Sequence, residues 1–314
     1  MPPTISICIP CYQSERYIRT TIESVLAQTV LPDELLISDD NSTDRSFEIV
    51  SEYQGVPPVK IIRPEHRLTL GAHYRFLLER ATGDYVTFLS SDDALMPNYV
   101  ETMRTQLAGE PDLAMIAAAC LECDDHLRPL RLRGGGLPDR ALSAPEGFQF
   151  FTHGNQYTIS VAMLSRRILL STPPIPAEAN LTTDWGWALL LGALGKIKFI
   201  RTPLGYYRFH GSNASVDKND DWQRAGVALL GFLSGYLDPE RGRELAPEIE
   251  GLRGQIASRE EGRSGPEPGL PLSEKGKNLV KGLLAMRYRA LPFPITQAEK
   301  GIGVALERIR SVHV

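Results

Sequence analysis

The sequence predicts an α/β fold in which a mostly parallel sheet is flanked by helices and followed by a helical C-terminal extension. Three observations predict it. Apolar runs of strand length alternate with segments of helical spacing over residues 1–120, as in βαβ units with right-handed crossovers. Two of these runs end in paired aspartates. Towards the C-terminus the apolar spacing is helical only.

Five apolar runs in the first half are predicted strands, at residues 5–9, 35–38, 59–62, 85–89 and 113–119. Between them, apolar side chains recur every three or four residues, which indicates amphipathic helices packed on the sheet. We expect Ser14 to cap the first helix, residues 41–44 to cap the second, and Pro97 to occupy the first turn of the fourth.

The regular alternation ends after residue 120. Three successive glycines, Gly134 to Gly136, predict a mobile loop over residues 131–138. The remaining apolar runs predict a helix at 185–194 and strands at 158–164, 197–200 and 204–209.

The paired aspartates are the most informative polar residues. Asp39-Asp40 and Asp92-Asp93 each close a predicted strand, and open α/β sheets bind ligands at the carboxyl ends of their strands. Two carboxylate pairs at one edge suit a nucleotide with a divalent metal ion, because Mg²⁺ and Mn²⁺ prefer hard oxygen ligands.

Composition excludes some classes of protein. The 314 residues carry 34 Lys and Arg against 38 Asp and Glu, a net charge of −4, so a general nucleic-acid binder is not expected. The N-terminus has no charged-then-apolar leader, and no apolar stretch approaches the roughly 20 residues that span a bilayer. We therefore expect a cytoplasmic protein, at most peripheral to a membrane.

The four cysteines form two C-x-x-C spacings, Cys8 with Cys11 and Cys120 with Cys123. Such spacings can indicate zinc. Cys8, however, lies inside an apolar strand, which favours core packing and reduced thiols.

Four phrases of the N-terminal part resemble family 2 of the nucleotide-sugar glycosyltransferases, which have the GT-A fold. They are ICIPCY at 7–12, SVLAQT at 24–29, ISDDNSTD at 37–44 and ATGDYVTFLSSDD at 81–93. The likeness extends over about residues 4–215. It implies a catalytic domain at 1–215, with a nucleotide-binding half at about 1–120 and an acceptor half at 121–215. A helical region at 216–314, with a flexible linker at 258–273, is expected to follow.

The resemblance implies a nucleotide site around the first two strands. Pro10 lies in it, and Tyr12 stacks on the base, as aromatic faces do cheaply; a surface tyrosine is the alternative. Asp40 is expected to accept a hydrogen bond from the base N3–H, with Asp39 behind it or capping the next helix. Asp92 is expected to contact the ribose or a metal-bound water.

The resemblance also implies a metal ion, Mg²⁺ or Mn²⁺, which neutralises the leaving diphosphate as a Lewis acid. Asp93 is the expected ligand, although the usual D-x-D signature is degenerate and begins with Ser91. The segment 207–215 resembles the closing segment of the family and implies that His210 reaches the metal or the diphosphate. An exposed loop histidine is the alternative.

Asp184 matches the position of the catalytic base in the family. A helix N-terminus would hold its carboxylate ionised, although an aspartate there can also be a plain N-cap. The usual glutamate before it is replaced by Thr183. Trp185, Trp187 and Asn155 are the expected acceptor residues, with core packing as the alternative for at least one tryptophan.

The implied reaction is inverting transfer of a sugar from a UDP or dTDP sugar to a hydroxyl group of a saccharide, lipid-linked or natural-product acceptor. A sugar-1-phosphate nucleotidyltransferase is disfavoured because residues 10–15 contain no glycine to grip a triphosphate. A non-catalytic sugar-nucleotide or glycan-binding module is the other alternative, favoured by the degenerate metal motif and the missing glutamate.

The last segment of the chain is basic. It could lie on an anionic membrane, or pack on the catalytic domain or on a second subunit as a homodimer contact. The residues concerned are Lys277, Lys281, Arg287 and Arg289.

Overall fold

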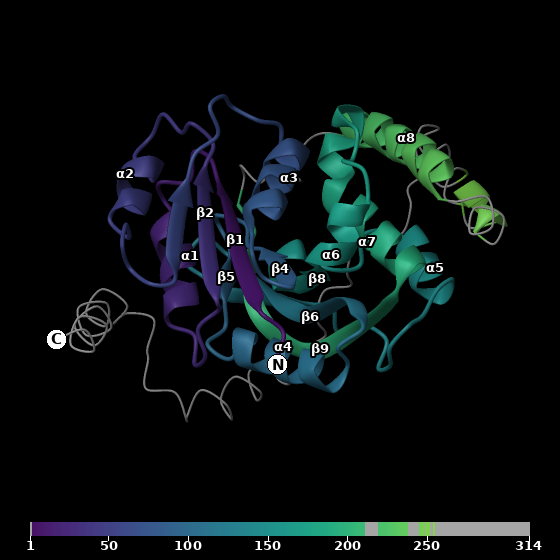
Figure 1. Cartoon of the computed structure of the whole chain (residues 1–314), viewed down its shortest axis with the longest axis horizontal. Helices are drawn as coiled ribbons and strands as arrows, with labels where there is room; N and C mark the ends of the chain where they lie inside the picture. The colour runs from purple at the N-terminus through teal and green to yellow at the C-terminus, as the bar shows by residue number, and fades with distance from the viewer. Residues whose placement is uncertain (1, 211–218, 238–244, 248, 252–253, 255–314) are drawn as a thin grey trace. The chain divides into compact units, whose positions relative to one another are not determined.

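The structure is a computed structural model that describes residues 2–210, 219–237, 245–247, 249–251 and 254, all within the unit formed by residues 1–268. In this unit a twisted sheet lies between two groups of helices (Figure 1). The predicted boundary at 215, the predicted linker at 258–273 and the basic stretch around Lys277 lie outside the described residues and stay predictions. Within the described residues, no helix is both long and apolar enough to cross a membrane.

The described part of the chain forms a nine-stranded sheet with the order β3-β2-β1-β4-β8-β6-β9-β5, and β7 pairs with β6. The strands β1 to β4 pair in parallel, as do β6 and β9, whereas β5, β7 and β8 are antiparallel to their neighbours. Their bounds are β1 Ile5–Cys11, β2 Glu34–Asp39, β3 Val59–Ile62, β4 Tyr85–Phe88, β5 Ala94–Leu95, β6 Leu113–Cys123, β7 Pro129–Arg133, β8 Ala162–Ser165 and β9 Lys196–Arg208.

The described helices largely fall between these strands, as βαβ connections require. They are α1 Ile18–Leu26, α2 Ser46–Ser51, α3 Leu70–Arg80, α4 Tyr99–Gly109, α5 Glu146–Thr152, α6 Arg166–Ser171, α7 Thr183–Leu194 and α8 Asn219–Tyr236. Short 3-10 turns at Ile159–Val161 and Ala177–Thr182 precede β8 and α7.

Both faces of the sheet are apolar, and each packs against its own helices. On one face α1, α2 and α4 cover side chains that include Ile7, Ile9 and Ile37. On the other, α3, α5, α7 and α8 cover side chains that include Cys8 and Phe88. Because consecutive strand residues point to opposite sides, β1 contributes side chains to both apolar clusters. Each fully buried isoleucine contributes about 1.5–3 kcal/mol relative to an exposed one.

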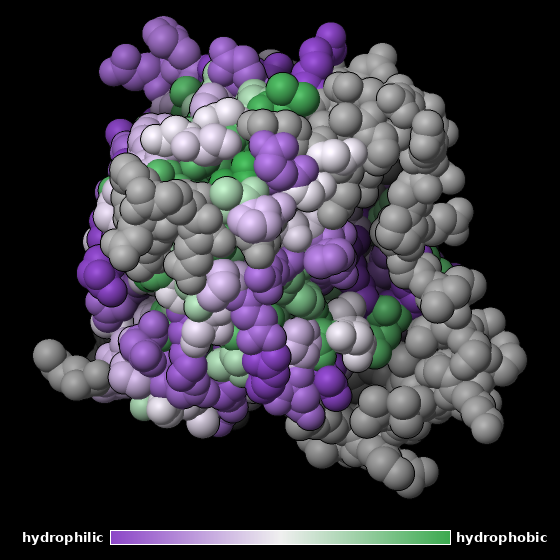
Figure 2. Space-filling model, turned by 90° about the vertical axis from the view of Figure 1, so that its right-hand side faces the viewer, coloured by the Kyte–Doolittle hydropathy of each residue, from purple (hydrophilic) through white to green (hydrophobic). Residues whose placement is uncertain are grey.

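Few large apolar side chains are exposed among the described residues: Val30, Leu31, Leu130, Phe209 and Val227. On the face towards α5 and α8, Figure 2 shows hydrophilic residues interspersed with small apolar areas. The described part of the chain therefore buries its apolar side chains mainly in the two clusters.

The predicted α/β fold is confirmed, and several local predictions need correction. The N-cap of α1 is Tyr17 rather than Ser14, and α4 begins at Tyr99, two residues after Pro97. Residues 129–133 form strand β7 rather than part of a loop, because they pair with β6. Gly134 then turns the chain with φ +87°, and a Cβ there would lie 3.0 Å from Ala119 Cα. The stretch 158–164 is partly a 3-10 turn, and the two strands predicted between 197 and 209 are one strand, β9.

Candidate active site

The carboxyl ends of β1, β2 and β4 lie side by side, because β1 pairs in parallel with both other strands. Cys11 at the end of β1 stands opposite Asp39 at the end of β2. Hydrogen bonds join the residues that follow: Asp40 N–H donates to Cys11 O over 2.8 Å, and Ser14 Oγ lies 2.6 Å from Ser91 Oγ. The segments carrying the two acidic pairs therefore meet at one edge of the sheet.

Asp39 is fully buried at this edge. Its Oδ2 accepts hydrogen bonds from the Arg63 guanidinium at 3.0 Å and from Ser42 N–H at 3.2 Å. Its Oδ1 is buried and has no hydrogen-bond partner. A buried acceptor without a donor costs about 1–3 kcal/mol. A ligand N–H that donated a hydrogen bond to Asp39 Oδ1 would therefore remove this cost.

Asp40 is already engaged. Both of its carboxylate oxygens accept from Leu68 N–H, at 2.9 and 3.2 Å. Burial raises the pKa of the Asp40 carboxyl, and the bond from Leu68 opposes that rise. Asp40 thus holds the loop before α3. In the same region the guanidinium of Arg67 lies 3.8 Å from the centroid of the Tyr12 ring and covers one of its faces, while Pro10 is buried in β1.

Asp92 and Asp93 have opposite surroundings. Asp93 is fully buried, with one oxygen accepting from Ser160 Oγ at 2.5 Å and the other from Arg208 N–H at 2.8 Å. Burial, followed by the charge of Asp92, raises the pKa of the Asp93 carboxyl well above its usual range. Asp92 is partly exposed, and its Oδ2 lies 3.0 Å from His210 Nε2.

Asp92 and His210 are the pair that fits a divalent ion. Within the described residues, no group of three or more His, Cys, Asp or Glu side chains gathers to hold a metal. One carboxylate and one imidazole are suitable donors, and they leave coordination positions for the oxygens of a diphosphate. Asp93 is less suited to be the main ligand, because it is buried and each of its oxygens already accepts a hydrogen bond from the protein.

Tyr17 and Asp125 support this pair, and neither was identified from the sequence. The Tyr17 ring stacks on the His210 ring, with centroids 4.9 Å apart and planes inclined by 23°. The Tyr17 hydroxyl donates to Asp125 Oδ1 over 3.1 Å. Arg208 Nε donates to Asp92 O over 2.6 Å, and its guanidinium carbon lies 4.6 Å from the Tyr17 ring centroid. These contacts join the start of α1, the turn after β6 and the end of β9.

Asp184 lies in the first turn of α7, whose N-cap is Thr182 rather than Asp184. Its Oδ2 accepts a hydrogen bond from Asn155 Nδ2 over 2.7 Å. Burial raises the pKa of the Asp184 carboxyl, opposed by hydrogen bonds from Trp185 N–H and Asn155. A carboxyl group with a raised pKa and a fixed orientation is suited to general base catalysis. Asn155 Oδ1 is buried without a partner.

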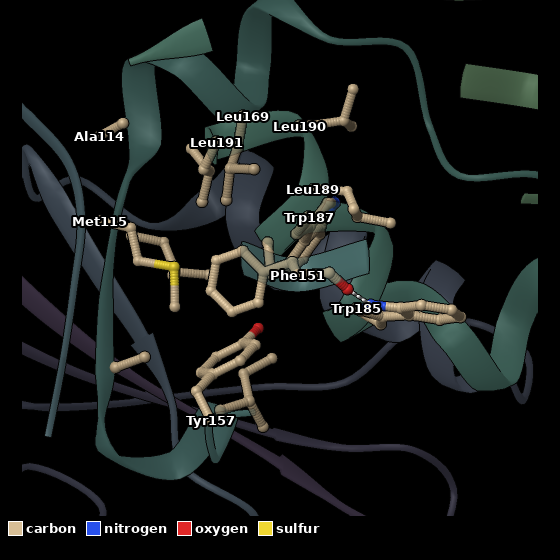
Figure 3. Packing of buried hydrophobic residues seen from close by; sticks show 14 of the residues in the cluster. Ala114, Met115, Phe151, Tyr157, Leu169, Trp185, Trp187, Leu189, Leu190 and Leu191 are labelled. Atoms are coloured by element: carbon tan, nitrogen blue, oxygen red, sulfur yellow. Dashed lines mark hydrogen bonds between the residues drawn. The ribbon is translucent and has the colours of Figure 1, made fainter. Parts of the chain in front are cut away.

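The two tryptophans belong to the core and do not line an acceptor site. Trp185 and Trp187 are 9% and 3% exposed. Trp185 Nε1 donates to Phe151 O over 2.8 Å, the dashed contact in Figure 3. The Trp187 ring packs against Phe88 and Tyr74, with centroids 5.0 and 5.7 Å away. Their prediction as acceptor residues is therefore wrong, because α7 is buried on nearly all sides.

Tyr74 lies between the two ends of the site. Burial raises the pKa of its hydroxyl, and the charges of Asp184, Asp92 and Asp93 raise it further. All three carboxylates are therefore near one side chain of α3.

The cysteines do not form a zinc site in the described residues. All four are free and buried, and burial raises the pKa of each thiol, to about 12 for Cys11 and about 11 for Cys120. Neutral thiols in a core are poor metal ligands. They act as small apolar side chains.

With this site on the sheet edge, the sequence matches the family model "Glycosyl transferase family 2" over residues 6–169. The chain belongs to this family. It is a glycosyltransferase, an enzyme that uses a nucleotide sugar.

The chain is similar to several named proteins. The putative glycosyltransferase EpsH of Bacillus subtilis is 36% identical over 75% of this chain and 69% of its own length. The uncharacterized glycosyltransferase YibD of Escherichia coli is 37% identical over 73% and 70%. Among solved structures, S. aureus TarS 1-349 in complex with UDP-GlcNAc superposes with a TM-score of 0.60 at 15% identity, covering 83% of this chain and 73% of that chain. This likeness confirms the GT-A fold.

Proposed function

We propose that the protein is an inverting, metal-assisted glycosyltransferase. It takes a sugar from a UDP or dTDP sugar and attaches it to a hydroxyl group of a saccharide, lipid-linked or natural-product acceptor. The observation that carries the proposal is that the segments with Asp39 and Asp92 meet at the carboxyl ends of β1, β2 and β4. Asp184, a carboxyl group with a raised pKa, completes the proposed site. The solved structure with UDP-GlcNAc shares this fold, which supports a uridine nucleotide as donor.

The base is recognised by Asp39 and Tyr12. Uracil and thymine carry an N3–H donor, and Asp39 Oδ1 is a buried acceptor without a partner. This assigns to Asp39 the role that the sequence suggests for Asp40, because Asp40 is bound to the backbone of Leu68. The base stacks on Tyr12 once Arg67 shifts from the ring face that it covers, or on the other face of that ring.

Asp92 and His210 would hold the divalent ion, Mn²⁺ or Mg²⁺. When bound, the ion supplies Lewis-acid neutralisation of the diphosphate charge. This moves the proposed metal contact from Asp93 to its neighbour. Asp93 instead ties Ser160 and the end of β9 to the metal corner through its two hydrogen bonds.

Asp184 removes the proton from the acceptor hydroxyl group. The acceptor oxygen forms a bond to the anomeric carbon as the bond to the diphosphate oxygen breaks, the proton passes to the Asp184 carboxylate, and the configuration inverts in this single displacement. Asn155 Nδ2 orients the carboxylate. Among the described residues, Asp184 is the one carboxylate that we assign to the acceptor end, which supports direct displacement over a covalent intermediate.

The test is Asp184→Asn, with Asp84→Asn as the matched control. Asp84 accepts from Thr4 N–H at the amino-end edge of the sheet, away from the site. Loss of the base should lower the rate of UDP release in the presence of acceptor by about 10²- to 10⁴-fold, while UDP-sugar affinity measured by calorimetry is retained. The control should turn over like the wild type. Equal turnover in Asp184→Asn would remove Asp184 from the mechanism.

A further inference from the structure

Arg133 is a half-buried cation that pairs with no acidic side chain among the described residues. Two other shielded arginines have carboxylate partners: Arg75 has Glu79, and Arg104 has Asp33. Arg133 makes a ring contact instead, with its guanidinium carbon 5.4 Å from the centroid of Tyr207. A charge that loses hydration without gaining a partner binds an anion favourably when one arrives, and a guanidinium matches carboxylate and phosphate oxygens with two parallel hydrogen bonds.

A short series of contacts connects Arg133 with the proposed base. It ends β7 directly opposite Cys120 of β6, and directly opposed residues of antiparallel strands project on the same side. Cys120 Sγ lies 3.3 Å from Thr158 Oγ1. The next residue back along the chain, Tyr157, donates its hydroxyl to Asp184 O over 2.8 Å. The positive charge of Arg133 also lowers the pKa of the Asp184 carboxyl against the effect of burial.

The backbone that carries Arg133 is fixed on both sides. Residues 131–133 pair with β6, and the guanidinium of Arg131 pairs with Glu122 at 2.7 Å. Gly134 follows with a positive φ and lies so close to Ala119 that a Cβ would meet its Cα at 3.0 Å. The strand end therefore presents Arg133 from a set position, which lowers the entropy lost when a ligand binds.

Resting on the proposed function, we infer that Arg133 binds a carboxylate or phosphate group of the acceptor, so that the acceptor is an acidic saccharide. The proposed function assigns the donor diphosphate to Asp92 and His210 rather than to Arg133. An anion at Arg133 would set the acceptor hydroxyl group against Asp184. Arg133 is thus a residue for acceptor specificity, and a neutral acceptor loses this contact.

The test measures acceptor binding without turnover. The UDP-bound protein is titrated by ligand-observed NMR with methyl glucuronide, with a phosphorylated methyl glucoside and with neutral methyl glucoside. We expect both acidic probes to bind at least about tenfold more tightly than the neutral one, as a charge-assisted hydrogen bond allows, and to weaken with salt. Comparison of the two acidic probes distinguishes carboxylate from phosphate as the group that is bound.

Arg133→Gln should abolish the preference and leave the affinity for methyl glucoside and for UDP unchanged, while Arg133→Lys should keep part of it. The matched control is Arg128→Gln, which removes a positive charge from an exposed position next to the same strand and should leave the preference intact. A wild type without preference, or a preference lost equally in Arg128→Gln, overturns the inference.

Two further outcomes also overturn it. Weaker UDP binding in Arg133→Gln would assign Arg133 to the donor. An unchanged preference with the acid limb of the pH–rate profile moved to higher pH would assign Arg133 to Asp184 alone. The proposed function fails in a different way, if the wild type neither binds a UDP-sugar nor releases UDP from it with any acceptor. Intact turnover without a preference for acidic acceptors removes only the role of Arg133.

Discussion

At the scale of single residues, Asp92 and Asp93 are neighbours in sequence but have very different surroundings. Asp93 is 1% exposed, whereas the Asp92 side chain is 24% exposed and faces His210. Asp92 lies in the turn after β4, and Asp93 follows it directly before β5. One carboxylate of the pair is therefore directed into the core and the other towards the ligand site.

The first prediction separates these two carboxylates. Asp92→Asn should lower the Mn²⁺ affinity of the UDP-bound protein by at least about tenfold, because a direct ligand matters at least as much as an outer hydrogen-bond partner. The Mn²⁺ affinity of Asp93→Asn should remain within about threefold of that of the wild type, because Asp93 would not bind the ion directly. Mn²⁺ binding is measured by electron paramagnetic resonance, and folding by circular dichroism. A folded Asp93→Asn that loses Mn²⁺ while Asp92→Asn keeps it would restore the sequence-based assignment.

Asn155 should set the pH dependence of turnover. Its Nδ2 stabilises the ionised Asp184 carboxylate and so lowers the pKa of that group. In Asn155→Ala the pKa should therefore rise, and the acid limb of the kcat profile should move to higher pH, with activity approaching that of the wild type well above the limb. Gln156→Ala, at an exposed neighbouring position, is the control. An acid limb that stays in place would show that the bond does not act on the catalytic carboxylate.

At the scale of elements, the parallel half of the sheet is predictable from the sequence because each strand and helix there has its own period. Strand β7 is not, since it is short and the glycines that follow it favour a loop reading, although it forms a hairpin with β6 immediately before it. Pro203 lies where the register of β6 and β9 shifts. Prolines are tolerated at such bulges. The proline interrupts the apolar pattern of β9, so the sequence predicts two strands where the structure has one.

The helix α7 shows why the acceptor residues were misjudged. Tryptophans next to a candidate base suggest a sugar site, but the tight packing of this helix against α5 and the sheet leaves room for them only in the core. The positions of the acidic residues were predictable, since they follow from strand ends. The division of roles within each pair was not, because it depends on Leu68, Ser160 and Arg208 from other parts of the fold.

At the scale of the described unit, the proposed donor site joins segments that are far apart in the chain: the ends of β1 and β2, the corner after β4 and the end of β9. A ligand that bridges them binds only the folded state. At one hundred times its dissociation constant such a ligand raises the free energy of unfolding by about 2.7 kcal/mol. For a unit of this size that corresponds to a rise in Tm of about 5–10 °C.

The last prediction follows from the small number of protein donors at the metal corner. Because Asp92 and His210 are the two described residues that would hold the ion, the diphosphate must complete its coordination, and neither UDP nor Mn²⁺ should stabilise the fold fully by itself. UDP with Mn²⁺ should raise Tm by about 5–10 °C, UDP with EDTA by clearly less, and Mn²⁺ alone by little. Asp92→Asn should reduce the combined shift to that of UDP with EDTA, whereas Asp84→Asn should retain it. Thermal scans by circular dichroism measure all of these, and a full shift with UDP in EDTA would contradict a shared metal site.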